Sequence, residues 1–251
     1  TSHFGRRRTG GDGTQKELLG GKGANLAERS AIGLPVPPGF TITTEVCAAF
    51  DEGGQRLPTG LMDEVRTHVH LIEEETGKHF GAAGDPLLVS VRSGAAVSMP
   101  GMMDTVLNLG LTDDGVDGLA AVTGNERFAL DAYRRLINMF GNVVMGVEHK
   151  HFEQAFARIK KREGVELDTE VSVEGLRDLV AAYQKVYRKH VTAAFPQDPY
   201  RQLALAIEAV FRSWNAPRAI AYRRINEITG LVGTAVNVQA MVFGKIGRAH
   251  V

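Results

Sequence analysis

The chain changes character near residue 112, and this change limits the folds open to it more than any other feature. The first hundred residues are rich in glycine and proline and carry short β-like runs. Between about 112 and 197, apolar residues recur three and four positions apart, as amphipathic helices require. Residues 235–243 then alternate apolar and polar side chains, which is typical of a half-exposed strand. This order predicts an α+β fold in which a helical subdomain is inserted into a mixed one.

Local patterns predict the individual elements. A helix over residues 24–30 ends at Gly33, a strand follows at 39–43, and Thr44 begins a short helix that reaches residue 50. Apolar residues at helical spacing predict a helix from Leu61 to about Gly77. A short buried strand is expected at 87–91. Further helices are expected at residues 128–147, 152–159, 176–191, 199–214 (begun by Asp198 and Pro199) and 217–228.

Composition excludes several classes of protein. Of 251 residues, 43% are apolar and 23% are charged, which is ordinary for a folded domain. The 29 basic and 29 acidic residues cancel, so neither nucleic acid nor a membrane surface is expected as a partner. Cys47 is the single cysteine, which excludes an internal disulfide and fits a reducing compartment. With no apolar run of about 20 residues and no secretory signal at the start, we expect a cytoplasmic protein.

Glycines surround a lysine in the run Gly20, Gly21, Lys22 and Gly23. Glycines allow backbone N–H groups to approach an anion, the following helix N-terminus favours negative charge, and the lysine adds a mobile cation. The run is not a P-loop, since Lys22 is followed by glycine instead of serine or threonine. A plain glycine turn before a helix, with a solvated lysine, explains the local pattern equally well.

Arg92 follows the expected strand at 87–91 and precedes Ser93 and Gly94. Ligands collect at strand ends in such folds, and a guanidinium there can bind phosphate through two parallel hydrogen bonds. Taken alone, an arginine that solvates a sheet edge is the simpler interpretation. The stretch 98–104 places three methionines within five positions, which favours partial burial or a mobile lid.

Other catalytic arrangements have no support in the sequence. The histidines show no partnering carboxylate cluster, and His68 and His70 stand two positions apart on a helix and so face different ways. Cys47 is most simply a small core residue. The residues therefore give no local signature of a metal site or of nucleophilic catalysis.

Several stretches together resemble the N-terminal nucleotide-binding domain of the pyruvate, phosphate dikinase family. The resemblance covers nearly the whole chain from about residue 10, and the middle block is highly specific. It is carried by residues 18–28, 33–41, 87–109, 127–144, 211–224 and 233–243.

The resemblance implies an ATP-grasp-like first lobe with an inserted α-helical subdomain and without the second lobe. Its expected parts are residues 1–111 for the first part of the lobe, 112–197 for the helical insert, 198–243 for the return to the lobe, and 244–251 for a truncated tail. Lys22 and Arg92 match the family's ATP-binding lysine and arginine. The candidate phosphate loop consists of Gly20, Gly21, Gly23, Ser93, Gly94 and Gly101.

The resemblance also implies a reaction. The family is a phosphotransferase with paired acceptors: a β-phosphoryl group passes from ATP to a histidine on a separate swivelling domain, and then to pyruvate. Phosphate is the co-substrate, AMP and pyrophosphate leave, and Mg²⁺ accompanies ATP. The expected partners are therefore ATP, phosphate and the swivelling phosphohistidine domain, in a parent chain that is a homo-oligomer.

The remaining expectations concern features of the family that are not found in this sequence. The phosphocarrier histidine and the Mg²⁺ ligands are expected outside this chain, so the fragment alone is expected to be inactive and to bind MgATP weakly. The alternative is a stand-alone, non-catalytic module that binds a nucleotide or a partner.

The resemblance stops near Phe243, and residues 246–251 match one reading frame of a common sequencing-adapter sequence. We therefore expect those six residues to be an assembly artefact lying disordered on the surface; an ordinary flexible C-terminus is the alternative.

Overall fold

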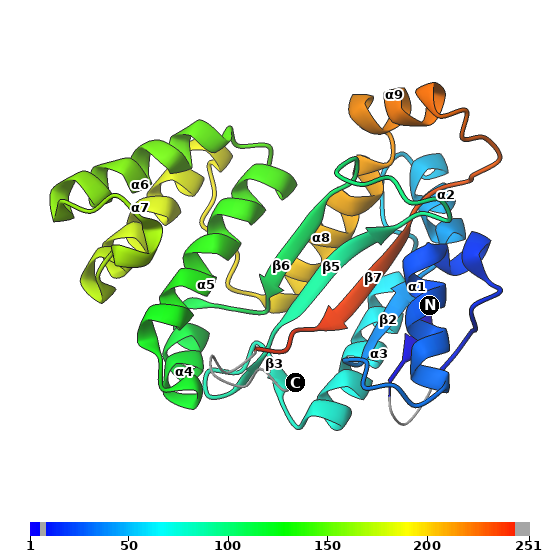
Figure 1. The fold of residues 1–251 in the computed structure, drawn as a ribbon, viewed down its shortest axis with the longest axis horizontal. Coiled ribbons are helices and arrows are strands. Elements are labelled where there is room, and N and C mark those ends of the chain that lie inside the picture. Colours follow the sequence, from blue (N-terminus) through cyan, green and yellow to red (C-terminus); the bar gives the residue numbers. More distant parts are fainter. Residues whose placement is uncertain (6–8, 244–251) are drawn as a thin grey trace.

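An antiparallel five-stranded sheet forms the centre of the chain, in the order β1-β2-β7-β5-β6 (Figure 1). The computed structural model describes residues 1–5 and 9–243. A separate two-stranded parallel pair is formed by β3 (His79–Phe80) and β4 (Pro86–Leu87). The strands of the main sheet are β1 (Ser2–Phe4), β2 (Gly39–Ile42), β7 (Ala235–Ala240), β5 (Val89–Gly94) and β6 (Thr105–Leu109). The α+β prediction is confirmed.

The two faces of this sheet differ in polarity. Val238 of β7 lies opposite Phe40 of β2 and Val91 of β5, and these side chains belong to the main apolar core together with residues of α8 (Pro199–Ser213). One position earlier on β7, Asn237 lies opposite polar side chains, on the face covered by α1 (Lys16–Ala31). The prediction of a half-exposed strand at 235–243 is therefore wrong: β7 is the central strand, and its polar face is covered by a helix.

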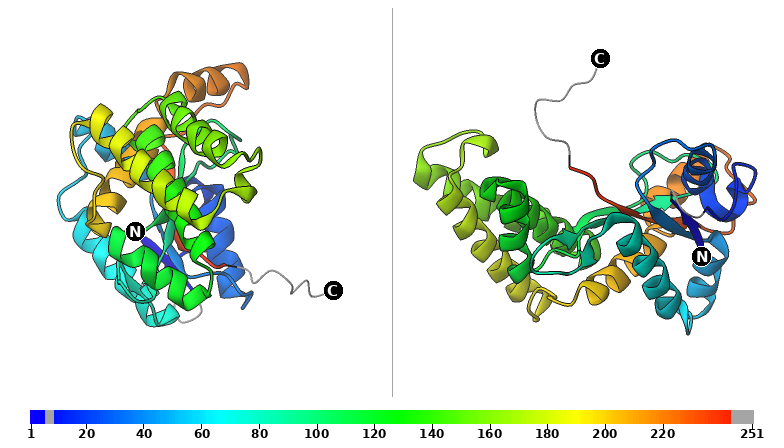
Figure 2. Two further views of the ribbon diagram at one scale, coloured as in Figure 1. Left: turned by 90° about the vertical axis from the view of Figure 1, so that its left-hand side faces the viewer. Right: turned by 90° about the horizontal axis from the view of Figure 1, so that it is seen from below.

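Four helices form an arm at the β6 edge of the sheet. Its helix α5 contacts α4, α7 and β6, and its apolar residues join the same core as the sheet. Figure 2 shows the arm extending away from the part of the molecule that carries α1. The arm consists of α4 (Asp113–Thr123), α5 (Glu126–Met139) with a π-helical turn at Phe140–Val144, α6 (His149–Glu163), a 3₁₀ turn at Asp168–Glu170, and α7 (Val173–Val191).

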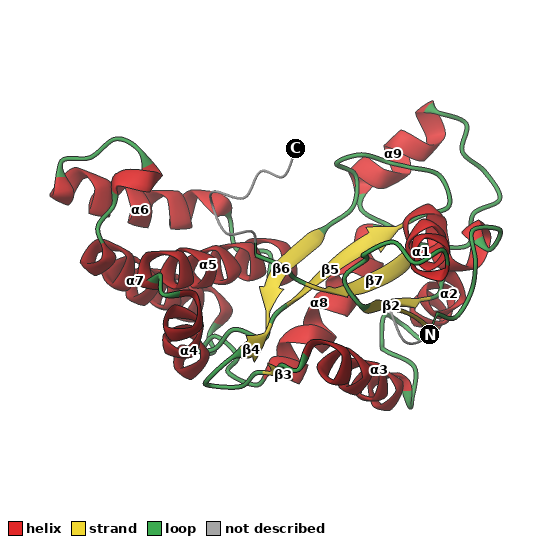
Figure 3. Cartoon of the chain, turned by 60° about the horizontal axis from the view of Figure 1, so that its bottom comes forward, coloured by secondary structure: helices red, strands yellow, loops and turns green. Residues whose placement is uncertain are grey.

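Three further helices surround the sheet (Figure 3). They are α2 (Thr44–Glu52), α3 (Leu61–Thr76) and α9 (Pro217–Ile225). Two helix ends carry the local signals expected from the sequence. Gly77 ends α3 in a left-handed conformation at φ +69°. At the start of α8, the Asp198 carboxylate accepts a hydrogen bond from the Tyr200 N–H at 2.9 Å. Among the described helices, none is both long and apolar enough to cross a bilayer.

Several predicted boundaries need correction. The helix expected at 24–30 begins earlier, at Lys16, and is interrupted at Gly20, so Gly21 to Gly23 are helical and do not form a turn. The expected strand at 87–91 is divided between β4 and β5. Arg92 therefore lies inside β5 and not after a strand end. Helix α2 is capped by Thr43, while the Thr44 hydroxyl donates to the Glu17 carbonyl at 2.8 Å. The predictions for 244–251 lie outside the described residues.

Candidate functional site

Three side chains form a row across the polar face of the sheet. Asn237 of β7 lies directly opposite Thr41 of β2 on one side and Arg92 of β5 on the other. Residues paired in this way project from the same face of an antiparallel sheet. The Thr41 hydroxyl donates a hydrogen bond to Asn237 Oδ1 at 2.8 Å, and both residues are buried. This row is the floor on which α1 packs.

Gly20 brings α1 into contact with the end of β5. Its backbone angles, φ +69° and ψ +162°, interrupt the helix and suit only glycine. A Cβ at this position would lie 1.6 Å from the Gly94 carbonyl oxygen, so no larger residue fits without moving the backbone. The next amide, Gly21 N–H, donates to the Ala95 carbonyl at 3.0 Å. Gly20 therefore fixes the start of α1 against the segment that follows β5.

Two more glycines allow close packing around the Asn237 amide. A Cβ on Gly23 would lie 2.9 Å from Asn237 Oδ1, and a Cβ on Gly94 would lie 2.5 Å from Asn237 Nδ2. Both distances are shorter than real Cβ atoms show. The geometry thus gives Gly23 and Gly94 a packing role, since they let α1 and β5 close around one buried amide.

This packing brings Lys22 and Arg92 together, although seventy positions separate them in sequence. Lys22 follows Gly21 on α1, and Arg92 projects from the sheet beneath that helix. Partial burial lowers the pKa of the Lys22 ammonium, and the positive charge of the neighbouring Arg92 lowers it further. The influence of Arg92 on the pKa of the Lys22 ammonium places the two cations in one region of the molecule.

A cavity of about 570 Å³ opens beside Lys22, within the range of small-ligand sites. Of the sequence-predicted site residues, Gly21, Lys22, Ser93, Gly94 and Gly101 line it, whereas Gly20, Gly23 and Arg92 do not. The segment from Ala95 to Met103 supplies most of the remaining wall.

The loop between β5 and β6 is held at its start by the hydrogen bond from Gly21 N–H to the Ala95 carbonyl and at its far end by α9. The Arg218 guanidinium of α9 donates to the Met102 carbonyl at 3.0 Å and to the Asp104 carboxylate. Met99 is 6% exposed and packs into the core, as the methionine-rich sequence suggests. Gly101, at φ +74°, has no atom within 4 Å of its Cβ position. The loop thus combines anchored ends with an open tip at the rim of the cavity.

Comparison with known proteins identifies this arrangement. The family model described as "Pyruvate phosphate dikinase, AMP/ATP-binding domain" matches residues 16–59 and 54–249. The chain belongs to this family. The match runs past Phe243, where the resemblance was expected to stop, into residues whose structure is not described here.

Relatives named as dikinases match almost the whole chain. The chain is 57% identical over 245 residues to pyruvate, phosphate dikinase, chloroplastic, from Mesembryanthemum crystallinum, covering 98% of this chain and 26% of that protein. Dikinase 1, chloroplastic, of Arabidopsis thaliana is 56% identical over 97% of this chain and 25% of its own length, and dikinase 2 of Zea mays is 56% identical over 98% and 28%. The chain therefore spans about a quarter of these relatives.

These relatives contradict the prediction of a cytoplasmic location, because the proteins from Mesembryanthemum and Arabidopsis are named as chloroplastic. The inference failed for a physical reason. A single buried cysteine and a balanced charge limit the redox chemistry and the partners of a protein, and they do not specify its compartment.

Three polar wall residues of this dikinase-family site were missed in the sequence. They are Lys16 and Asn25 of α1 and Thr105 of β6, which all line the cavity. Asn25 follows Lys22 by three positions, a spacing that places both on one face of a helix and was available as a signal. Lys16 had no such signal, because the interruption at Gly20 changes the face it presents.

The described part of the dikinase-family cavity does not fit a magnesium site. Among the described residues, the polar side chains of its walls are those of lysine, asparagine, serine and threonine, with no carboxylate, whereas Mg²⁺ in nucleotide sites is held by carboxylates. Asp104 lies near the rim, but its carboxylate accepts from Arg218. Among the described residues, no group of three or more histidine, cysteine or acidic side chains is arranged to hold a metal ion.

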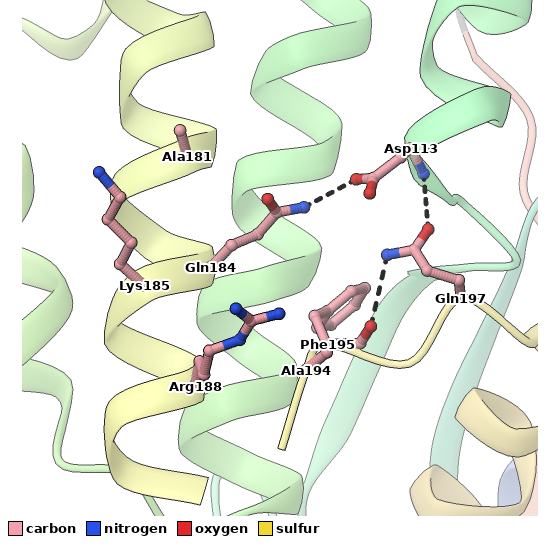
Figure 4. A pocket seen from close by; sticks show the side chains of 8 residues that line it. All are labelled: Asp113, Ala181, Gln184, Lys185, Arg188, Ala194, Phe195 and Gln197. Atoms are coloured by element: carbon pink, nitrogen blue, oxygen red, sulfur yellow. Dashed lines mark hydrogen bonds between the residues drawn. The ribbon is translucent and has the colours of Figure 1, made fainter. Parts of the chain in front are cut away.

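A second cavity, of about 290 Å³, lies in the helical arm of this dikinase-family domain (Figure 4). Its polar side chains bind one another: Gln184 Nε2 donates to the Asp113 carboxylate at 2.7 Å, and the Asp113 N–H donates to Gln197 Oε1 at 2.8 Å. The Tyr133 hydroxyl also donates to Asp113, at 2.6 Å. These contacts join α4, α5 and α7 to the segment before α8, so we interpret this network as structural.

Proposed function

We propose that the chain is the first lobe of an ATP-grasp-type domain with a helical insert. Residues 1–111 and 198–243 would form the lobe, 112–197 the insert, and the second lobe would be supplied by another part of a longer protein. The proposal is supported by the family match and by the position of the helical arm at one edge of the sheet. It also agrees with a chain that covers about a quarter of its relatives.

We propose that Lys22 and Arg92 bind the polyphosphate of ATP. The observation that carries this proposal is that Lys22 lines the cavity while the charge of Arg92, which does not line it, helps to lower the pKa of the Lys22 ammonium. Two neighbouring cations are suited to neutralise the charge that redistributes over phosphate oxygens during transfer. Arg92 would act as a planar bidentate donor, and Lys22 as a mobile point charge.

The glycine-containing segments would complete the phosphate site. Ser93 and Gly101 would place a hydroxyl and backbone N–H groups near the anion, together with Gly21 and Gly94 in the cavity wall. Gly20 and Gly23 would act by holding α1 in place. The loop at 94–101 would cover the phosphates and exclude water, and Arg218 would hold its far end.

Magnesium would be supplied with ATP and held by residues outside this chain, since the described cavity lacks carboxylates. The metal would offset phosphate charge. The residues of this chain would bind and orient the nucleotide and keep water away.

We propose that the longer protein catalyses the reaction for which its relatives are named, that of a pyruvate, phosphate dikinase. The β-phosphoryl group of ATP would pass to a histidine of a swivelling domain and then to pyruvate, with phosphate as co-substrate and AMP and pyrophosphate as products. The histidine would lie outside this chain. A stand-alone nucleotide- or partner-binding module remains the second candidate, and it would show no histidine-dependent transfer.

Lys22→Ala in the longer dikinase chain tests this proposal. We expect the ATP partial reaction to slow by about 10- to 100-fold, the loss typical of a charged hydrogen-bond donor. Exchange between pyruvate and phosphoenolpyruvate at the remote site should stay near normal. Lys185→Ala, in the arm cavity, is the matched control and should leave both partial reactions unchanged. Equal loss of both reactions in Lys22→Ala would indicate misfolding, and an unchanged ATP reaction would refute the role of Lys22.

A further inference from the structure

Asn237 carries a buried hydrogen-bond donor that has no acceptor in the part of the chain that the structure describes. The side chain is 2% exposed, and its Oδ1 accepts from Thr41 Oγ1 at 2.8 Å. Its Nδ2 has no partner. An unsatisfied buried donor destabilises a folded protein, and native structures keep few of them. A side chain that tolerates this cost at the centre of the sheet calls for a functional explanation.

The Nδ2 end of the amide lies beside Gly94, which together with Lys22 lines the cavity. The Cβ position of Gly94 lies 2.5 Å from Asn237 Nδ2 and 3.6 Å from Lys22 Cβ, so these groups surround one point. Arg92 lies directly opposite Asn237 across β5 and β7. The N–H groups of the amide therefore lie behind the part of the cavity wall formed by Gly94 and Lys22, next to Arg92 in the sheet.

Thr41 orients this amide. Its hydroxyl donates to Oδ1, so the O–H bond and the amide dipole are aligned head to tail, with the positive end of the amide at Nδ2 beside Gly94. Successive hydrogen bonds polarise one another, and a buried dipole acts more strongly than an exposed one. Gly23 on one side and Gly94 on the other hold the amide in this orientation.

We infer that Asn237 is a positioning residue of the anion site: fixed by Thr41, its amide directs positive potential at a phosphate group held by Lys22 and Arg92. The inference rests on the proposed polyphosphate role of those two cations. Asn237 would act from beneath the site without touching the ligand, since Nδ2 is fully buried.

The variant pair Thr41→Val with Asn237→Leu tests this inference in the chain of 251 residues. It replaces both polar partners by side chains of similar shape, a change that is close to neutral for stability. The probe is inorganic tripolyphosphate, titrated into the millimolar range and followed through the backbone amide signals of the site glycines. The matched control is Ser90→Ala, because Ser90 is also 2% exposed and bonds across β5 and β7, to the Gln239 carbonyl.

We expect the double variant to bind tripolyphosphate about fivefold more weakly, the size of effect that the partial charges of a helix end have on a nearby charge, and Ser90→Ala to bind as the unaltered chain does. The loss should grow from phosphate to pyrophosphate to tripolyphosphate, because an electrostatic effect follows ligand charge. Asn237→Asp, which replaces the donor by a negative charge, should weaken binding further. Equal loss for all three anions would indicate a packing role and would overturn the inference.

Lys22→Ala in the same titration separates the inference from the proposed function. If Lys22→Ala binds tripolyphosphate as the unaltered chain does, the proposed function fails and the inference fails with it. If Lys22→Ala weakens binding and the folded double variant does not, only the inference is overturned. Should the double variant not fold, Thr41→Val alone decides the question, since it removes only the group that orients the amide; unchanged binding in that variant refutes the inference.

Discussion

Replacing Gly20 by alanine tests whether this single glycine holds α1 against β5. The new methyl group would lie 1.6 Å from the Gly94 carbonyl oxygen, less than half of a normal contact distance. Either α1 or the segment after β5 must move, and the hydrogen bond from Gly21 N–H to the Ala95 carbonyl would then be lost. Lys22 is two residues away and would move with the helix.

The magnitude follows from three contributions. The backbone conformation of Gly20 costs a non-glycine residue about 1–3 kcal/mol. Steric overlap in a packed region adds about 1–3 kcal/mol, and the lost hydrogen bond adds about 1 kcal/mol. The free energy of unfolding should therefore fall by about 3–7 kcal/mol, a large share of the about 5–15 kcal/mol that stabilises typical domains.

Gly33→Ala is the matched control, because Gly33 also has a positive φ, +79°, but no atom lies within 4 Å of its Cβ position. It should lose only about 1–2 kcal/mol of backbone strain. Urea denaturation followed by circular dichroism measures both changes. If Gly20→Ala and Gly33→Ala lower the free energy of unfolding equally, the close contact between Gly20 and Gly94 does not exist in solution, and the argument for the site geometry fails with it.

Three further predictions concern single side chains. Arg218→Ala should free the loop end at Asp104, which limited proteolysis should detect as faster cleavage within 95–104, while global stability changes by about 1 kcal/mol or less because the ion pair is partly exposed. Burial raises the pKa of the Cys47 thiol to about 11, so iodoacetamide at pH 8 should modify it only after unfolding; rapid labelling of the native protein would contradict its buried position. Burial, His3 and the N-terminal ammonium lower the pKa of His68 to about 4, so the folded state binds fewer protons than the unfolded state between about pH 4 and 6.5. Stability should then fall as the pH decreases through that window, and His68→Gln should flatten the dependence; a flat profile in the unaltered chain would refute it.

Helices with clear periodicity and end signals could be predicted from the sequence. Leu61 to Gly77 and the Asp198 cap behave as local physical chemistry requires. The central position of β7 could not be predicted this way. Its alternating pattern is the same whether solvent or a helix covers the polar face, and the helix that covers it lies 200 positions earlier in the chain.

The site was predictable only in parts. Local patterns pointed to Lys22 and to Arg92 separately, and the resemblance to a family linked them; the geometry that joins them depends on strand register across β2, β7 and β5. Asn237 had no local signal, because in sequence it is one polar position of an alternating strand. Whether a buried donor or acceptor has a hydrogen-bond partner can be judged only when the positions of the neighbouring elements are known.

The strand order also sets the sequence of events during synthesis on the ribosome. The central strand β7 is the last of the five to be made, and it pairs with β2 and β5, which precede it by about 200 and about 145 residues. Pairings so distant in sequence close slowly, because the intervening chain must first be ordered. Until residue 240 emerges, β2 and β5 each leave an unpaired edge that can join a strand of another nascent chain. Nascent chains paused before β7 should therefore depend on chaperones, and those released after it should not.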